Sequence, residues 1–196
     1  MPGEASFEVV LARHGQTEWS ADHRHTGRTD VPLTDEGERQ AIALGAALRT
    51  RAFDAVIVSP LERARRTYEL SGVGPAAEVV SDLAEWDYGD IEGRRTLDVR
   101  EEIPGWLIWK HGPPGGETPQ QVQRRVDRVV ERLMQMQSNV AVFAHGHLLR
   151  ALTARWLEFP VLEGRRFVLD TATISVLGCY RGERVIQTWN DGAHLG

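Results

Sequence analysis

Val9-Val10-Leu11-Ala12-Arg13-His14-Gly15 joins a short apolar run to an arginine and a histidine. The same form recurs at Ala55–Val58, which is followed by Ser59, and at Val140–Ala144, which is followed by His145. Continuous apolar runs of this length are typical of strands buried on both faces, as in a parallel sheet covered by helices. The three stretches therefore predict a buried sheet whose strands end in polar residues.

Helical patterns lie between these runs. Thr34 precedes an apolar stripe and is a predicted helix cap, and Thr118-Pro119-Gln120-Gln121 has the form of a capping box before a second stripe. Ser59-Pro60-Leu61-Glu62 has a similar form, which predicts a helix with Pro60 at its first position. A further helix is predicted from about 147 to 158.

Two strands are predicted near the end of the sequence, at 174–180 and 185–189, joined by a turn at Arg181-Gly182-Glu183. Strands and helices thus alternate, which favours an α/β domain. We predict a single domain over residues 1–196, with a mostly parallel central sheet flanked by helices on both faces. Residues 85–117 (the 85–117 segment) are rich in Gly, Pro and Trp and too long for a simple connection, so we expect a lid-like insertion there.

The composition argues against several classes of protein. Hydrophobic residues make up 41% and charged residues 26% of the chain, as in ordinary globular proteins, and no run approaches the ~20 apolar residues that span a bilayer. The net charge of -5 gives no indication of a nucleic-acid partner or of an anionic membrane surface. The single cysteine excludes an intramolecular disulfide. Because the start of the sequence has no basic and apolar leader, we expect a soluble, cytoplasmic protein.

Arginine and histidine side chains follow the three predicted strands. Arg13 and His14 follow the first strand, Arg63 comes one helical turn after the second, and His145 follows the third. The carboxyl ends of parallel strands meet at one edge of a sheet, where helix N-termini also attract anions. Arginine suits phosphate oxygens, and an imidazole is a suitable nucleophile. Taken singly, Arg63 is more simply a surface charge, and His145 fits a buried structural histidine as well as a site residue. Their common placement after the strands predicts a phosphate pocket.

Motif blocks occur in a characteristic order along the chain. They are Leu11-Ala12-Arg13-His14-Gly15-Gln16-Thr17-Glu18-Trp19, Thr26-Gly27, residues 32–37, residues 59–67, Glu85-Trp86-Asp87-Tyr88-Gly89 with Glu92-Gly93, residues 115–118, and His145-Gly146-His147. In this order the blocks resemble the histidine phosphatase superfamily, the phosphoglycerate mutase-like proteins. Arg-His-Gly alone is a weak signal, whereas several ordered blocks are a strong one.

The resemblance implies a role for each matching residue. His14 would take the phosphoryl group on its imidazole. Arg13, Arg63 and His145 would bind the phosphoryl oxygens and stabilise their charge during transfer. Glu85 would protonate the leaving oxygen and then accept a proton from the attacking water.

The resemblance also implies substrate contacts, and it implies no metal and no cofactor. The implied contacts are Gln16, Ser20, Thr26, Gly27, Gly146 and His147. Glu92 is a rival to Glu85 for the acid, and Glu85 is preferred because the family's acid stands first in its block.

Departures from the mutases of the family favour hydrolysis. Trp86 follows Glu85 where the mutases usually carry an arginine, and Ser20 stands where they commonly have asparagine. The motifs look most like a branch of small phosphatases that includes sugar-bisphosphatases acting on sedoheptulose bisphosphate and broad acid phosphatases. We therefore expect metal-independent hydrolysis of a small phosphorylated metabolite such as a sugar (bis)phosphate, with phosphoglycerate mutase as the alternative. The sequence leaves open a homodimer.

Two other classes of function stay open. One is a protein that binds a phosphorylated ligand without catalysis. The other is a metal site built from His23, His25, His145 and His147, although no carboxylate stands at a convincing ligand spacing.

Several residues of the 85–117 segment have two interpretations. Trp106 and Trp109 either contact the substrate or form the core of the segment. Arg95, Arg100 and Lys110 either reach a second phosphate or are solvated surface charges, and the second interpretation is favoured for any one of them.

Overall fold

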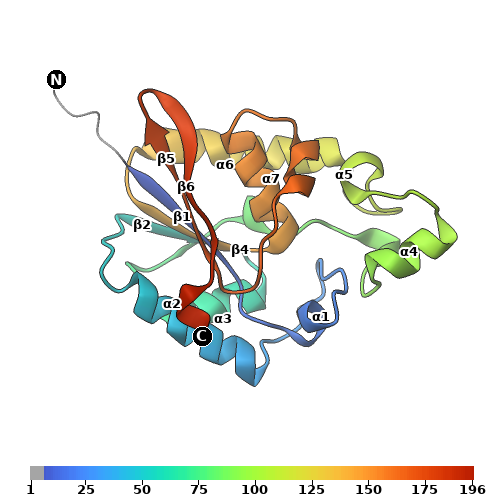
Figure 1. The fold of residues 1–196 in the computed structure, drawn as a ribbon, viewed down its shortest axis with the longest axis horizontal. Helices are drawn as coiled ribbons and strands as arrows, with labels where there is room; N and C mark the ends of the chain where they lie inside the picture. The colour runs from blue at the N-terminus through green and yellow to red at the C-terminus, as the bar shows by residue number, and fades with distance from the viewer. Residues whose placement is uncertain (1–6) are drawn as a thin grey trace.

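A six-stranded sheet runs through the centre of the computed structural model, which describes residues 7–196 (Figure 1). The strands are β1 (Glu8–Arg13), β2 (Ala55–Val58), β3 (Glu78–Val79), β4 (Val140–Ala144), β5 (Ile174–Tyr180) and β6 (Glu183–Asp191), in the order β3-β2-β4-β1-β5-β6. The pairs β3/β2, β2/β4 and β4/β1 are parallel, and the pairs β1/β5 and β5/β6 are antiparallel. The predicted, mostly parallel sheet is thus confirmed.

Helices cover both faces of the sheet, and short helices lie beyond its edge. They are α1 (Glu18–Ala21), α2 (Asp35–Leu48), α3 (Glu62–Ser71), α4 (Thr96–Glu102), α5 (Ile108–His111), α6 (Pro119–Met136) and α7 (Gly146–Trp156), with 3₁₀ turns at Ser81–Leu83, Gly89–Ile91, Val161–Arg166 and Ala193–Leu195.

Two separate cores form because successive strand side chains point to opposite faces. Leu11 and Val142 belong to a core with α6 and α7, whereas Val10 and Phe143 belong to a core with α2 and α3. Figure 1 shows these two helical layers on either side of the sheet. The predicted class, a single α/β domain with helices on both faces, is confirmed.

Two predicted helix starts are confirmed and a third is wrong. Thr34 caps α2 through the Gly37 N–H (3.0 Å), and Thr118 forms the predicted capping box at α6. The predicted box at residues 59–62 is wrong, because α3 begins at Glu62 after Leu61, which makes no side-chain cap. The Ser59 hydroxyl instead accepts the Leu61 N–H (3.2 Å) and pairs with a buried histidine described below.

The 85–117 segment carries α4 and α5, which extend away from the sheet in green and yellow in Figure 1. Its tryptophan side chains are buried rather than presented to a ligand: Trp86, Trp106 and Trp109 are at most 3% exposed. Trp86 and Trp109 pack edge to face with ring centroids 5.4 Å apart. Of the two interpretations of Trp106 and Trp109, the structure supports the core. Within residues 7–196, no helix has the length and apolar character needed to cross a membrane.

Candidate active site

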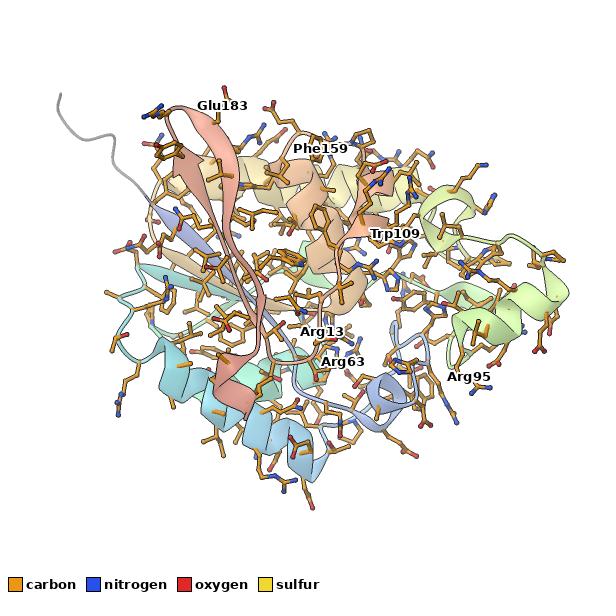
Figure 2. All side chains as sticks on the ribbon, in the orientation of Figure 1. Arg13, Arg63, Arg95, Trp109, Phe159 and Glu183 are labelled. Atoms are coloured by element: carbon orange, nitrogen blue, oxygen red, sulfur yellow. The ribbon has the colours of Figure 1, made fainter. Side chains whose placement is uncertain are left out.

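A cavity of about 430 Å³ lies where β1 and β4 end. The predicted site residues on its wall are Arg13, His14, Gln16, Ser20, Thr26, Glu85, Gly146 and His147. Arg63 and His145 are fully buried rather than part of the wall, and Gly27 also lies off the wall. Figure 2 shows Arg13 and Arg63 near the strand ends in the middle of the molecule.

His14 stands directly after β1 and is 3% exposed. Its Nδ1 lies 2.7 Å from the Gly15 carbonyl oxygen, which can only accept, so Nδ1 carries the proton and Nε2 is the free nitrogen. Burial, together with the charges of Arg63 and Arg13, holds the pKa of His14 well below its ordinary value. The imidazole is therefore neutral at pH 7, as a nucleophile must be.

Gly15 makes this placement of His14 possible. A Cβ on Gly15 would collide with the backbone carbonyl of Gly37, at the start of α2. The glycine therefore lets the chain after β1 lie directly against that helix. The Gly15 N–H in turn donates to the Thr67 hydroxyl of α3 (2.9 Å), which fixes the turn from a second side.

Arg13, His14, Arg63 and His145 form what we call the sheet-end cluster. Arg13 donates through Nη1 to the Leu169 carbonyl (2.5 Å), and His145 pairs through Nε2 with the Ser59 hydroxyl (2.7 Å). The centroids of the His14 and His145 rings lie 5.2 Å apart. Arg63 donates to the carbonyls of residues 26, 27 and 29 at 2.9–3.0 Å, so it also shapes the loop that carries Thr26.

Unpaired nitrogen atoms gather in this cluster. Among the described side chains, four buried nitrogen atoms lack a hydrogen-bond partner: Nε of Arg13, Nε of Arg63, Nδ1 of His145 and Nε1 of Trp156. Leaving a buried donor unpaired costs about 1–3 kcal/mol. Three such atoms around one neutral histidine are an arrangement suited to the oxygens of a phosphoryl group.

Glu85 connects the 85–117 segment to the helix after β4. Its Oε1 accepts the N–H groups of Trp86 and Leu148 (both 2.9 Å), and its Oε2 accepts the N–H of His147 (3.0 Å). The carboxylate therefore caps the N-terminus of α7, where no side chain of the helix's own start does so. This holds Glu85 on the cavity wall in one orientation.

Neutral polar groups also line the cavity. The Tyr88 hydroxyl lies 2.7 Å from Nδ1 of His147, and the Thr96 hydroxyl lies 3.1 Å from Nε2 of His25. Burial lowers the pKa of His25 to about 4. Burial, followed by the charge of Arg150, also puts the pKa of His147 well below its ordinary value. Both imidazoles are thus neutral hydrogen-bonding groups at pH 7.

Arg150 is a wall residue that the sequence analysis missed. Its Cζ lies 4.9 Å from the centroid of the Trp109 ring, and its Nε donates to the Gly164 carbonyl (3.1 Å). Arg150 thus adds a cation to the wall. Gly146 and Arg150 are four residues apart on one helix, so helical periodicity could have revealed it. Arg24, His25 and Asp170 also line the cavity, and of these the sequence analysis had considered His25 only as a possible metal ligand.

Charged residues of α4 and α5 are not part of the wall. Arg95 pairs with Asp98 (2.9 Å), and Arg100 donates to the Trp106 carbonyl (2.9 Å). Figure 2 shows Arg95 at the start of α4, away from Arg13 and Arg63. The described residues contain no group of three or more His, Cys, Asp or Glu side chains that could hold a metal ion.

A family model agrees with this geometry. The model described as "Histidine phosphatase superfamily (branch 1)" matches residues 9–192. The chain belongs to the histidine phosphatase superfamily. The predicted family and the predicted enzyme class, a histidine phosphatase, are confirmed.

Curated relatives of this histidine phosphatase carry several names. An acid phosphatase of Mycobacterium tuberculosis is 42% identical, over 93% of this chain and 91% of the relative. The sedoheptulose 1,7-bisphosphatase of Saccharomyces cerevisiae is 36% identical, over 78% of this chain and 68% of the relative. A probable phosphoglycerate mutase of Klebsiella pneumoniae is 32% identical, over 96% and 95%.

A solved structure confirms the fold of this histidine phosphatase. The product of an open reading frame of Mycobacterium tuberculosis, 40% identical, superposes with a TM-score of 0.90 over 94% of this chain and 97% of that one. The cytoplasmic location and the homodimer stay predictions.

Proposed function

We propose that this protein hydrolyses phosphomonoesters of a small phosphorylated metabolite, such as a sugar (bis)phosphate, through a phosphohistidine at His14. The observation that carries the proposal is a neutral, buried His14 beside three unpaired, buried nitrogen atoms of Arg13, Arg63 and His145. Such an arrangement binds an anion and leaves one nitrogen free to attack it.

The reaction has two steps. In the first, Nε2 of His14 attacks phosphorus, the ester P–O bond breaks, and Glu85 gives its proton to the leaving oxygen. In the second, water attacks the phosphohistidine, Glu85 takes a proton from that water, and the N–P bond breaks to restore His14. The three N–H groups that donate to Glu85 hold its carboxyl group in one orientation for both steps.

The sheet-end cluster stabilises the transferred group in both steps. Arg13, Arg63 and His145 meet the phosphoryl oxygens, whose charge increases toward the transition state. No metal is needed in this scheme, because these side chains supply the positive charge. Gln16, Ser20, Thr26, Gly146 and His147 are proposed substrate contacts. Gly27 acts instead through its carbonyl, which holds Arg63.

The rest of the cavity supports a substrate with a second anionic group. Arg24 and Arg150 line the wall beyond the sheet-end cluster. A second phosphate would meet these cations, in keeping with the relative named a sedoheptulose bisphosphatase. A broader phosphatase, in keeping with the relative named an acid phosphatase, would use the sheet-end cluster alone.

Mutase activity is the second candidate, because one relative is named a probable phosphoglycerate mutase. A mutase must return the phosphoryl group to a second position on its substrate. Trp86 and Ser20, at positions where mutases of the family usually have arginine and asparagine, favour water as the acceptor.

The test is phosphate release from a panel of sugar bisphosphates, sugar monophosphates, phosphoglycerates and an aryl phosphate, with a chelator present. We expect release that His14→Ala abolishes and that His111→Ala, in an exposed histidine off the cavity wall, leaves intact. Arg150→Met should raise KM for bisphosphates about tenfold or more, and less for monophosphates. Transfer of phosphate between positions of phosphoglycerate, without release of free phosphate, would mean that the protein is a mutase rather than a hydrolase. Phosphate release that survives His14→Ala would refute the phosphohistidine.

A further inference from the structure

Glu85 lies on a piece of chain that has no regular structure to hold it. Residues 84–88 belong to no helix or strand, and they connect the 3₁₀ turns Ser81–Leu83 and Gly89–Ile91. A group that transfers a proton must nevertheless be held to within about 0.5 Å of its working position. Contacts from other parts of the chain must therefore hold the backbone around Glu85.

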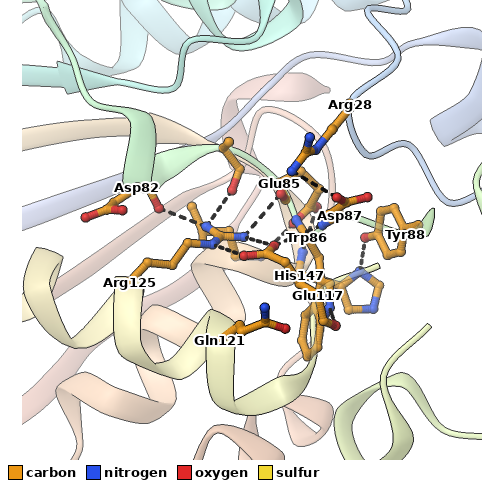
Figure 3. A network of polar contacts seen from close by, with 12 residues as sticks. Arg28, Asp82, Glu85, Trp86, Asp87, Tyr88, Glu117, Gln121, Arg125 and His147 are labelled. Carbon is orange, nitrogen blue, oxygen red and sulfur yellow. Dashed lines mark hydrogen bonds and ion pairs between the residues drawn. The ribbon is translucent and has the colours of Figure 1, made fainter. Parts of the chain in front are cut away.

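Arg125 of α6 supplies the contacts on the N-terminal side of Glu85. Its Nη1 donates to the carbonyls of Asp82 (2.8 Å) and Ala84 (2.7 Å), and its Nη2 donates to the carbonyl of Glu85 itself (3.1 Å). Figure 3 shows this guanidinium facing the chain that leads into Glu85. One side chain thus gathers three carbonyls of a loop about 40 residues away in the sequence.

Glu117 orients that guanidinium and holds the C-terminal side. Its two oxygens accept from Nε and Nη2 of Arg125 (both 2.8 Å), and Oε2 also accepts the Asp87 N–H (3.0 Å). Its carbonyl accepts the indole N–H of Trp86 (2.8 Å). Although burial alone raises the pKa of Glu117, the hydrogen bond and charge of Arg125 bring it below its ordinary value, so the carboxylate stays charged.

We propose that Arg125 and Glu117 form a positioning pair that holds the Glu85 carboxylate in place for proton transfer. The inference rests on the proposed function, in which Glu85 serves the leaving oxygen. Neither residue lines the cavity and, unlike Arg63 and His145, Arg125 has all of its guanidinium nitrogen atoms hydrogen-bonded within the protein, so the pair acts through Glu85. Arg125 is only 8% exposed, and the pair joins α6 to both sides of residue 85.

Substrates with different leaving groups distinguish a residue that positions Glu85 from one that only supports the fold. An alkyl phosphate such as glycerol phosphate has a basic leaving oxygen that needs a proton, whereas p-nitrophenyl phosphate expels a stable anion that does not. A misplaced Glu85 therefore slows the alkyl phosphate more than the aryl phosphate. A merely looser fold slows both equally.

The variants are Arg125→Lys, which keeps the charge but lacks the planar fork, and the milder Glu117→Gln. For each, we expect kcat/KM, which reports the first step up to loss of the leaving group, to fall about 10–100-fold on the alkyl phosphate and several-fold less on the aryl phosphate. Glu85→Gln is the reference and should show the same preference more strongly. Arg125→Lys added to Glu85→Gln should cause no further loss.

Arg155→Lys is the matched control. Arg155 pairs with Asp127 of α6 at 2.6 Å, is partly buried and does not contact Glu85, so its change should leave both rates unaltered. Equal losses on both substrates in Arg125→Lys and Glu117→Gln, or a further loss in the Glu85→Gln background, would overturn the positioning role. If Glu85→Gln itself showed no leaving-group preference, the acid role in the proposed function would fail as well, and that single variant would reveal it.

Discussion

The two sides of the cavity are built in different ways. The sheet-end cluster follows from the strand ladder: Arg13 is in register with Ala144 of β4, and the His14 N–H donates to the Ala144 carbonyl (3.0 Å). The 85–117 segment has no ladder and is held by buried indoles and by side chains that bind backbone carbonyls, such as Arg125. The first side is positioned by regular backbone, and the second by individual side chains.

The two sides also differ in how well their polar groups are paired. The sheet-end cluster leaves buried nitrogen atoms of Arg13, Arg63 and His145 without partners, whereas the ring nitrogens of Trp86 and Trp106 both donate to carbonyls. Proteins tolerate unpaired buried groups where function requires them. We therefore expect substitutions in the cluster to reduce activity and substitutions of the buried tryptophans of the segment to reduce stability.

The largest expected effect is on stability, from Trp109→Ala in the 85–117 segment. Trp109 is 3% exposed and packs against Trp86, so its removal should cost about 3–5 kcal/mol in the free energy of unfolding. Chemical denaturation measures this, with the 70% exposed Leu97→Ala as the neutral control. A loss below about 1 kcal/mol would mean that the indole core does not hold the segment.

Arg13→Met tests the sheet-end cluster. We expect kcat/KM to fall about 10²–10³-fold, because a cation that meets the developing charge is lost. The unfolding free energy should change by less than about 1 kcal/mol, since Arg13 makes one hydrogen bond and leaves Nε unpaired. Exposed Arg66→Met is the control. A large loss of stability with normal activity would contradict the expectation that the sheet-end cluster serves activity rather than stability.

His25 makes stability depend on pH. Its pKa is about 4 in the folded chain because of burial, against an ordinary 6.5, so between these values the unfolded chain binds more protons. The free energy of unfolding should therefore fall as the pH falls from 6.5 to 4, by about 3 kcal/mol from this residue. Denaturation of His25→Gln should show a shallower decline, whereas His23→Gln, an exposed neighbour, should keep the original slope. Parallel curves for His25→Gln and the unchanged protein would exclude His25 as the source.

The smallest effect concerns the junction between the 85–117 segment and α6. Thr118→Ala removes the hydroxyl that accepts the Gln121 N–H (3.2 Å) and should cost about 1 kcal/mol. Thermal unfolding would detect it, with exposed Gln120→Ala as the control. Because α6 carries Arg125, a lower activity of the folded variant would show that this helix start also affects Glu85.

Local signals predicted the sheet side well and the segment poorly. The apolar runs located β1, β2 and β4 to within a residue or two, and the polar residues after them do meet at one edge of the sheet. The capping signal at residues 59–62 failed because Ser59 is fully buried, where its hydroxyl pairs with His145 from 86 positions away. A pattern of four residues cannot reveal a partner at that distance.

Strand positions, helix starts at Thr34 and Thr118 and the order of the motif blocks were determined by the sequence alone, because burial periodicity and end capping involve neighbouring residues. Tertiary structure decided that Glu85 caps α7 across more than 60 positions, that Arg150 joins the cavity wall, and that Arg125 holds the loop before Glu85. These arrangements depend on which buried polar groups find partners once helices and sheet have packed, and that pairing is set by the whole fold rather than by any local stretch.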